Sequence, residues 1–357
     1  MNKRDAIRFG TVVSSRDNNL DLIRFVSAIA VIWSHSFSLT QGPHSLGAFL
    51  DQWTDQRLSF GGMAVAVFFL YGGILIAKSC ESHPDTRKFF IARCQRIFPQ
   101  LIFIVLFSTF VWGGVLTTLS ITDYLTNGET YRYLLNAILI PVHTLPGVFT
   151  FNPYPEVVNG SLWTLPVEFA AYILCYLIFR LTAFRKKTYI WTIIVVIACA
   201  IVYFAFFHLY MLSVVRAVLE FYIGVCLWVW RDKIILRPSW GILSIFATIV
   251  LCYFGWDIAA MLVTFPYACL WLGWGTRRKF SHFAKYGEFS YGIYLWAFPL
   301  QQTLVFLWPT PMHWAVNASL ISLIAICGGI FNYHVIDKPV MNMVRRRRKI
   351  TASTSHM

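Results

Sequence analysis

Two ionisable residues inside one apolar segment are the clearest indication of chemistry in this chain. Arg24 and His35 lie eleven residues apart within the hydrophobic range 20–40. At about 100° per residue, eleven steps of an α-helix make three turns plus roughly 20°, so both side chains share one face. Asp21 lies three residues before Arg24 on nearly the same face. Because ionisable groups inside a membrane are costly, this polar stripe predicts a functional site.

A carboxylate is predicted at a similar depth. Glu168 lies about seven residues, or roughly 10 Å, into an expected helix over 161–181. His35 lies roughly 8 Å from the same edge of a hydrocarbon core about 30 Å thick. A carboxylate beside an imidazole can fix its tautomer and raise its basicity, which favours Glu168 and His35 as a catalytic pair. The alternative is a structural ion pair between Glu168 and Arg216.

Two further pairs of charged residues are spaced to share a helix face. Arg93 and Arg96 precede Pro99 at the expected cytoplasmic start of a helix, where two guanidinium groups can bind a phosphate. Anchoring of the topology by basic residues explains them equally well. Arg216 and Glu220 lie at i and i+4, which predicts a structural pair whose charges neutralise each other.

The sequence predicts no metal site. The eight cysteines are scattered without paired spacing, so we expect small buried apolar residues rather than disulfides or metal ligands. The histidines of the expected outer loops, His44, His143 and His313, do not have the spacing of metal ligands.

Composition fixes the class of protein. The chain is 57% hydrophobic and only 13% charged, whereas soluble domains average about 25% charged residues. We therefore predict an all-α polytopic membrane protein. Ten apolar ranges approach the roughly 20 residues that a membrane-spanning helix needs, and we expect them to form one bundle. The ranges are 20–40, 60–78, 97–117, 161–181, 189–209, 214–231, 240–255, 258–275, 288–308 and 314–336.

The basic residues predict the orientation of this bundle. With the N-terminus inside, all but three of the 30 Lys and Arg fall at or near the cytoplasmic side, the exceptions being Arg57, Arg132 and Arg216. This bias predicts a topology with both termini inside. It also explains the net charge of +14 without a nucleic-acid partner.

Three regions follow from this topology: a cytoplasmic arm over 1–19, a membrane domain over 20–340 and a basic tail over 341–357. The run 345–349 is expected to anchor the topology and to meet anionic membrane lipid. The first apolar range has no small-residue cleavage site, so we expect it to be retained as a helix. The longest connection, 120–160, is expected outside, where it could shape a binding site with a short interfacial or re-entrant helix near 131–140.

Five segments, in this order, resemble the membrane acyltransferase-3 family over about residues 19–344. They are Leu20–His35 (Arg-x10-His), Phe68–Ile76, Arg93–Pro99 (Arg-x-x-Arg before Pro), Leu162–Glu168 (Trp-Ser-Leu-x-x-Glu) and Ser290–Pro299 (Ser-Tyr-x-x-Tyr-Leu-x-His-x-Pro). Three positions depart from the family pattern. Tyr71 replaces the usual Ser, Ala297 replaces a common His, and Asp337 replaces a common Glu. No role of that family His can therefore be carried over.

The resemblance implies a bacterial inner-membrane O-acyltransferase. Such an enzyme moves an acyl group, usually acetyl, from cytoplasmic acetyl-CoA to a hydroxyl of a surface or lipid-linked polysaccharide, such as O-antigen or exopolysaccharide. His35 is expected to be the general base, or a transient acyl carrier, with Glu168 as its partner. Arg24, Arg93 and Arg96 are expected to bind the donor. The supporting polar residues are Asp21, Trp163, Arg216, Glu220, Ser290 and Tyr294.

Two functions of other classes stay open from the residues alone. A transporter or flippase for a charged lipid-linked substrate would also use Arg, His and Glu inside the membrane. Against it stand the lack of an internal repeat and the pair Arg93 and Arg96. A structural membrane subunit without chemistry does not explain so many ionisable groups. The sequence does not fix the oligomeric state.

Overall fold

The computed structural model is helical almost throughout. It describes residues 6–55, 58–82, 85–207, 212–277, 279–308 and 310–344. Two short strands, β1 (Ile7–Arg8) and β2 (Ile235–Leu236), pair antiparallel with Ile7 opposite Leu236. The predicted all-α class is confirmed. Arg57 and the basic run 345–349 lie outside the described residues.

Among the described residues, seven helical segments are long and apolar enough to cross a membrane, so the chain is a polytopic membrane protein. They are Leu20–Gln41, Phe60–Ser82, Thr86–Leu116, Gly160–Thr182, Leu212–Val229, Asp257–Gly275 and Trp314–Val344. The other three predicted ranges also contain helices, namely α10 (Lys186–Phe207), α12 (Pro238–Tyr253) and α15 (Ser290–Leu307). The count of ten spans and the inward orientation of both termini stay predictions.

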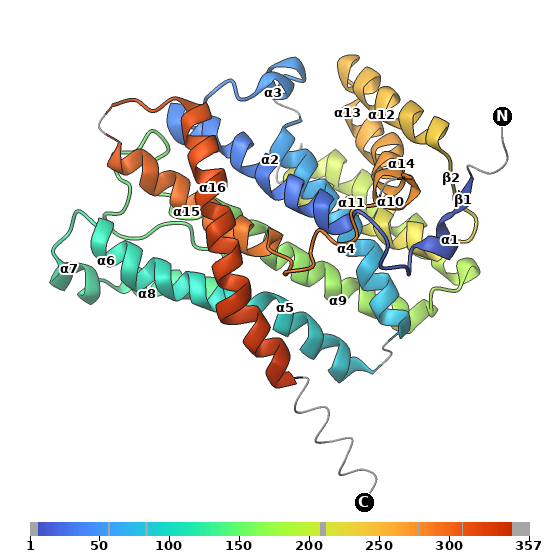
Figure 1. Cartoon of the computed structure of the whole chain (residues 1–357), viewed down its shortest axis with the longest axis horizontal. Helices are drawn as coiled ribbons and strands as arrows, with labels where there is room; N and C mark the ends of the chain where they lie inside the picture. The colour runs from blue at the N-terminus through green and yellow to red at the C-terminus, as the bar shows by residue number, and fades with distance from the viewer. Residues whose placement is uncertain are drawn as a thin grey trace, which may run out of the picture. The chain divides into compact units, whose positions relative to one another are not determined.

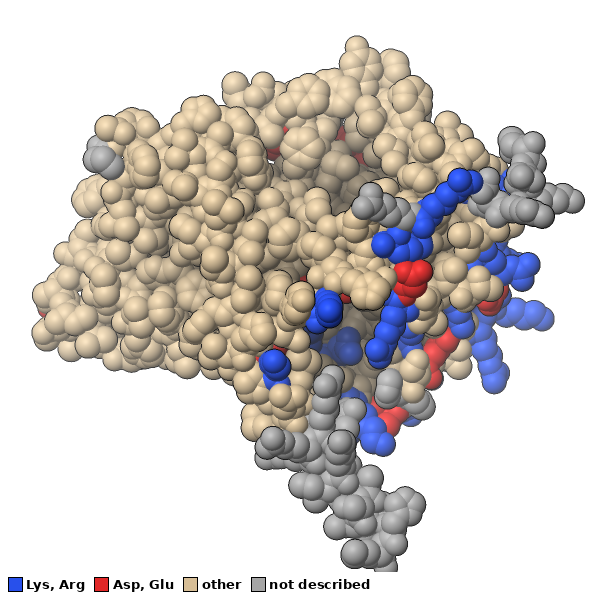
Figure 2. Space-filling model, viewed as in Figure 1, with Lys and Arg blue, Asp and Glu red and all other residues tan. Residues whose placement is uncertain are grey.

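The surface has the apolar character that lipid contact requires. Large hydrophobic side chains stand exposed on several helices, such as Leu181 at 83% and Val263 at 68%. Figure 2 shows broad areas of one face that carry no charged side chain. Contiguous apolar surface of this extent is not found on soluble monomers, and it matches a protein surrounded by acyl chains.

The chain divides into two compact units. The first comprises Met1–Ser27, Leu46–Asp85 and Val167–Lys285, and the second comprises Ala28–Ser45, Thr86–Pro166 and Tyr286–Met357. Two helices, α2 (Leu20–Gln41) and α9 (Thr164–Thr182), contribute residues to both units. The unbroken α2 confirms that Arg24 and His35 lie on one helix.

The first unit is built around α4 (Phe60–Ser82) and α11 (Leu212–Val229), which pack along each other. Two glycines allow this close approach: a Cβ atom on Gly73 would lie 2.0 Å from the carbonyl oxygen of Phe221, and one on Gly224 would lie 2.1 Å from that of Leu70. Small residues at such contacts let helix backbones approach each other inside a membrane. The remaining elements of this unit are α1 (Phe9–Val12), α3 (Phe49–Trp53), α10, α12, α13 (Asp257–Ala259), η5 (Ala260–Thr264), α14 (Phe265–Leu270) and η6 (Trp271–Gly275).

The second unit is built on α15 (Ser290–Leu307) and α16 (Trp314–Asn332), which pack against each other (Figure 1). Gly292 and Gly329 meet at their contact, where a Cβ atom on Gly292 would lie 2.8 Å from the Cα atom of Gly329. The unit also contains α5 (Thr86–Phe107), η2 (Ser108–Trp112), α6 (Gly113–Leu116), α7 (Ile121–Thr126), α8 (Gly128–Arg132), η3 (Tyr133–Ile138), η4 (Gly160–Trp163) and η7 (Tyr333–Asp337).

Several predicted boundaries are corrected by the structure. The third helix begins at Thr86 rather than near residue 97, because four basic residues in its first three turns interrupt the apolar pattern and lower its hydropathy. The range 258–275 is interrupted by the π-helical turns η5 and η6. In the long connection, the single short helix expected near 131–140 is instead α8 followed by the 3-10 helix η3.

Candidate active site

A polar cluster joins two of the sequence motifs in the second unit. Arg96, on α5, forms an ion pair with Glu288, just before α15. The second oxygen of Glu288 accepts hydrogen bonds from the backbone N–H, at 3.0 Å, and the hydroxyl of Ser290. The Arg96 guanidinium also lies 5.9 Å from the ring centre of Tyr291. Ser290 therefore holds Glu288, which in turn holds Arg96.

The same cluster includes the position where the family pattern has Glu. The amide of Gln100, one turn beyond Arg96 on α5, donates to the carboxylate of Asp337. Asn332 on α16 donates to the amide oxygen of Gln100 at 3.2 Å. Gln100 and Asn332 are buried, and hydrogen bonds of this kind are strong where water is excluded. Asp337 thus ties η7 (Tyr333–Asp337), which follows α16, to α5.

The longer α5 changes the argument for a phosphate site. Because α5 begins at Thr86, Arg93 and Arg96 lie inside the helix and not at its N-terminus, so the free N–H groups of a helix start are not beside them. The two guanidinium groups still share a face. Arg93 lies over the ring of Phe89, with 5.9 Å between the guanidinium carbon and the ring centre. Any attraction for phosphate must come from these side chains alone.

Residues 152–163, here called the anchored segment, are fastened to α15 by side chains. The amide nitrogen of Gln302 donates to the carbonyl oxygens of Tyr154 and Val157, both at 2.8 Å. Asn159 donates to the carbonyl oxygen of Leu295 at 3.1 Å. The Tyr294 hydroxyl donates to the carbonyl oxygen of Ser161 at 2.8 Å.

Two predicted supporting residues belong to this attachment. Tyr294 also lies 2.8 Å from the hydroxyl of Thr164, where α9 begins. Trp163 is half-buried at the end of η4. The Trp-Thr-Leu-Pro-Val-Glu motif is therefore held at its start by the Ser-Tyr-x-x-Tyr motif, which gives Tyr294 a positioning role.

His35 faces α15 in the same unit. Its ring centre lies 5.4 Å from that of Phe298, with the two rings at 72°. Phe298 also contacts the ring of Tyr154 and lies close to Gly160, both of which belong to the anchored segment. His35 is half-buried, whereas its neighbour Ser36 is fully buried. The structure thus brings His35, Phe298 and the anchored segment together.

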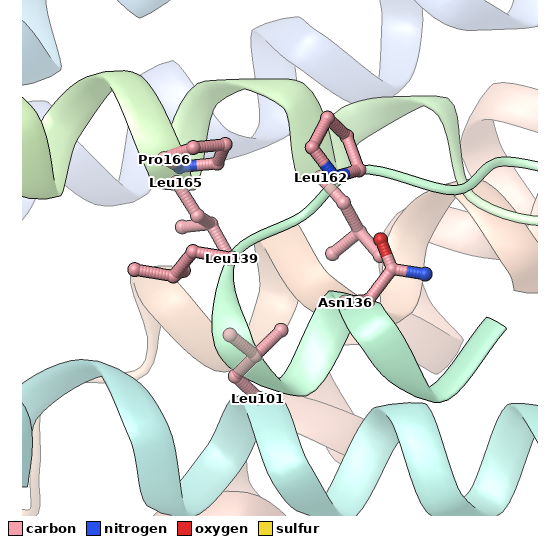
Figure 3. Close-up of a pocket in the computed structure, with 7 residues that line it drawn as sticks. Leu101, Asn136, Leu139, Leu162, Leu165 and Pro166 are labelled. Atoms are coloured by element: carbon pink, nitrogen blue, oxygen red, sulfur yellow. The ribbon is translucent and has the colours of Figure 1, made fainter. Parts of the chain in front are cut away.

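A small pocket lies between α5, η3 and the beginning of α9 (Figure 3). Leu101, Asn136, Leu139, Leu162 and Leu165 are among its lining residues, and its empty space of about 150 Å³ is mostly apolar. Pockets for small molecules measure about 300–1,000 Å³. This pocket is therefore a gap in the packing of the second unit, too small for a thioester donor.

Five of the predicted site residues lie elsewhere, in the first unit, namely Asp21, Arg24, Glu168, Arg216 and Glu220. Arg24 lies over the ring of Phe68, 5.9 Å from its centre, and Asp21 lies in the first turn of α2. The carboxylate of Glu168 accepts a hydrogen bond from the hydroxyl of Tyr172 on the next turn of α9. The pairing of Glu168 with His35 stays a prediction, since the two residues belong to different units.

The predicted ion pair between Arg216 and Glu220 is wrong. Arg216 instead donates to Asp257 at 3.0 Å, and Asp257 is buried at the start of α13. Spacing at i and i+4 only places two side chains on one helix face, and a partner from another helix satisfies Arg216 here. Neither carboxylate oxygen of the buried Glu220 has a hydrogen-bond partner in the part of the chain that the structure describes.

We expect Glu220→Leu to stabilise the protein. A buried polar group without a partner costs roughly 1–3 kcal/mol, and leucine fills a similar volume without that cost. In contrast, Asp257→Ala should lower stability, because it leaves the Arg216 guanidinium without this carboxylate. The unfolding temperatures of the two variants in detergent check this. Destabilisation by Glu220→Leu would show that the carboxylate is satisfied in the membrane protein.

The sequence analysis missed the amide side chains that organise the second unit. Gln100, Asn159, Gln302 and Asn317 are all buried and hydrogen-bonded to neighbouring elements. The signal was available, because an amide inside an apolar range must find a partner there. Over the described ranges, no group of three His, Cys, Asp or Glu side chains could hold a metal ion. All eight cysteines are free.

Comparison with known proteins decides the family. The model of the acyltransferase domain matches residues 17–331, which is most of the chain. The chain belongs to the membrane acyltransferase-3 family. An acyltransferase-3 protein is an enzyme, so the chain is an acyltransferase rather than a structural subunit.

The names of three relatives of this acyltransferase-3 chain state an enzymatic activity or a biological process. An "O-acetyl transferase" of Shigella phage Sf6 is 25% identical over 81% of this chain and 86% of the relative. "Acyltransferase MdmB" of Streptomyces mycarofaciens is 23% identical over 83% of this chain and 84% of the relative. "Nodulation protein 10" of Rhizobium leguminosarum bv. viciae is 32% identical over 45% of this chain and 43% of the relative. No solved structure gives a significant match.

Proposed function

We propose that this acyltransferase moves an acetyl group from acetyl-CoA to a hydroxyl of a surface or lipid-linked polysaccharide. The observation that carries the proposal is the match to an O-acetyl transferase over most of both chains. We further propose a bacterial inner membrane as its location, on the basis of the family. The ten apolar ranges support ten spans, and the distribution of Lys and Arg supports both termini in the cytoplasm. The transporter or flippase alternative is disfavoured by the acyltransferase family.

In this proposal His35 is the general base. Its imidazole takes the proton of the acceptor hydroxyl while the oxygen attacks the carbonyl carbon of the thioester. The tetrahedral intermediate then loses the CoA thiolate as the carbon–sulfur bond breaks, and the imidazolium returns the proton to sulfur. The polar, aromatic surroundings of His35, formed by Phe298 and the anchored segment, support this role. Glu168 is proposed to support the imidazole, and Arg24 to help hold the donor.

The donor is proposed to bind through Arg93 and Arg96. CoA carries several phosphate charges, and guanidinium groups bind phosphate with strong, directional hydrogen bonds. The ion pair with Glu288 fixes the position of the Arg96 guanidinium, a group that carries five N–H donors. Glu288 and Tyr291 then serve to hold the guanidinium in one orientation.

The function is tested by incubating the purified protein with radiolabelled acetyl-CoA and following both CoA release and labelled glycan. Acetyl transfer to a lipid-linked or surface polysaccharide supports the proposal. Transport of that glycan across proteoliposomes without CoA release would instead support the transporter alternative.

We expect Arg96→Ala to raise the KM for acetyl-CoA by about 10- to 100-fold, the equivalent of one or two lost charge-assisted hydrogen bonds. Arg93→Ala should act in the same direction. Arg87→Ala is the matched control, since Arg87 is exposed near the start of the same helix. The KM values are measured from initial rates at varied donor concentration. Equal KM values for all three variants would remove the two arginines from the donor site.

A further inference from the structure

Two contacts join one face of α2 to one face of α15. On α2, Ile32 and His35 lie three residues apart, and on α15 Phe298 and Gln301 have the same spacing. The amide nitrogen of Gln301 donates to the carbonyl oxygen of Ile32 at 2.9 Å, and Phe298 contacts the ring of His35. The contacts run in opposite directions along the two helices, so the helices are antiparallel here. Gln301 therefore lies about one turn, or roughly 4.5 Å along the axis, from the level of His35.

The amide of Gln301 is held from two sides. Its nitrogen also donates to the side-chain oxygen of Asn317 on α16 at 2.9 Å. Asn317 in turn donates to the backbone oxygen of Gln301 at 3.3 Å. Gln301 and Asn317 are both fully buried. The orientation of the amide is therefore fixed, with its nitrogen used twice.

The oxygen of the Gln301 amide differs from its nitrogen in its hydrogen bonding. Oε1 of Gln301 is buried and has no hydrogen-bond partner among the residues described by the structure. Such a buried acceptor is costly, by about 1–3 kcal/mol, unless it serves a donor at some stage of function. An imidazole N–H is a donor that chemistry at His35 would supply, because a general base needs its other ring nitrogen held as a donor.

We propose that Gln301 is a positioning residue for His35, an inference that rests on the proposed function. The amide nitrogen fixes the backbone of α2 one turn from His35. The amide oxygen accepts the imidazole N–H when His35 takes the acceptor proton. This hydrogen bond selects the tautomer whose free nitrogen faces the hydroxyl, and it stabilises the imidazolium that forms.

The test compares Gln301→Glu, Gln301→Met, His35→Ala and the matched control Thr303→Val. Thr303 is on α15, and its hydroxyl donates within that helix, to the carbonyl oxygen of Pro299. CoA release is measured from about pH 5 to 9 at saturating acetyl-CoA. A carboxylate at position 301 favours the protonated imidazole, so the acidic limb of the Gln301→Glu profile should move up by about one pH unit.

Gln301→Met removes the acceptor and should lower kcat by about 10-fold or more while leaving the KM for acetyl-CoA unchanged. Thr303→Val should match the wild type. Carbethoxylation of His35, followed by mass spectrometry, provides a readout without turnover. It should slow in Gln301→Glu near neutral pH, because the reagent attacks only the neutral ring.

The outcomes separate this inference from the proposed function. If His35→Ala is inactive but the folded Gln301 variants retain the wild-type kcat and pH profile, only the positioning role of Gln301 is overturned. If His35→Ala is fully active, the catalytic assignment of His35 fails as well. If Gln301→Glu does not fold, as judged by gel filtration, the kcat and KM of Gln301→Met decide whether Gln301 positions His35.

Discussion

His35→Ala should abolish acetyl transfer, with a loss of about 10²- to 10⁴-fold in kcat. The imidazole is proposed to remove the hydroxyl proton, and neither its α2 neighbours nor Phe298 on α15 offers another base. The KM for acetyl-CoA should change little, because the substitution leaves the proposed donor residues Arg24, Arg93 and Arg96 in place. The measurement is acceptor-dependent CoA release by purified protein at saturating donor.

The control for this experiment is a second histidine variant. His282→Ala removes an exposed imidazole from the connection after η6 and should retain the wild-type rate. Full activity of His35→Ala would exclude His35 as base or acyl carrier and would direct attention to Glu168. A covalent acetyl group on His35, trapped in the absence of acceptor, would instead favour the acyl-carrier role.

Gly73→Ala should cause a large loss of stability. Its Cβ atom would lie 2.0 Å from the carbonyl oxygen of Phe221 and 3.0 Å from the backbone nitrogen of Val225. Because these are backbone atoms of α11, the helices must separate, and overpacking of this kind costs about 1–3 kcal/mol or more. We expect a lower yield of folded protein and a clearly lower unfolding temperature in detergent.

The adjacent residue provides the control. A Cβ atom on Gly72 would meet only the Phe221 ring, at 3.6 Å, which is ordinary van der Waals contact. Gly72→Ala should therefore be tolerated and gains the better helix propensity of alanine. Equal unfolding temperatures for Gly72→Ala and Gly73→Ala would contradict the close contact of α4 and α11.

The fold was predictable where hydropathy alone determines structure. The membrane class and a helix in each of the ten apolar ranges follow from composition and run length. The start of α5 at Thr86 did not follow, because a basic helix that extends from the apolar range looks like a loop in hydropathy. The interrupted helix over 257–275 also escaped, since π-helical turns have no sequence pattern that separates them from α-helix.

The site was predictable as a set of residues but not as a set of partners. Arg96, Ser290 and Tyr294 were found from their motifs, yet the motif alone does not say that Glu288 joins Arg96 to Ser290. Arg216 shows the same limit, since its partner Asp257 lies 41 residues away. Spacing rules describe one helix at a time, and partners on different helices are chosen by packing.

The anchored segment is attached to α15 by hydrogen bonds between side chains and backbone carbonyl groups. Gln302, Asn159 and Tyr294 all bind main-chain carbonyl groups, at Tyr154, Val157, Leu295 and Ser161. Every residue type carries a carbonyl group, so side chains at 154 and 157 can be exchanged without loss of those bonds. The backbone position of this stretch is therefore set independently of the side chains at 154 and 157.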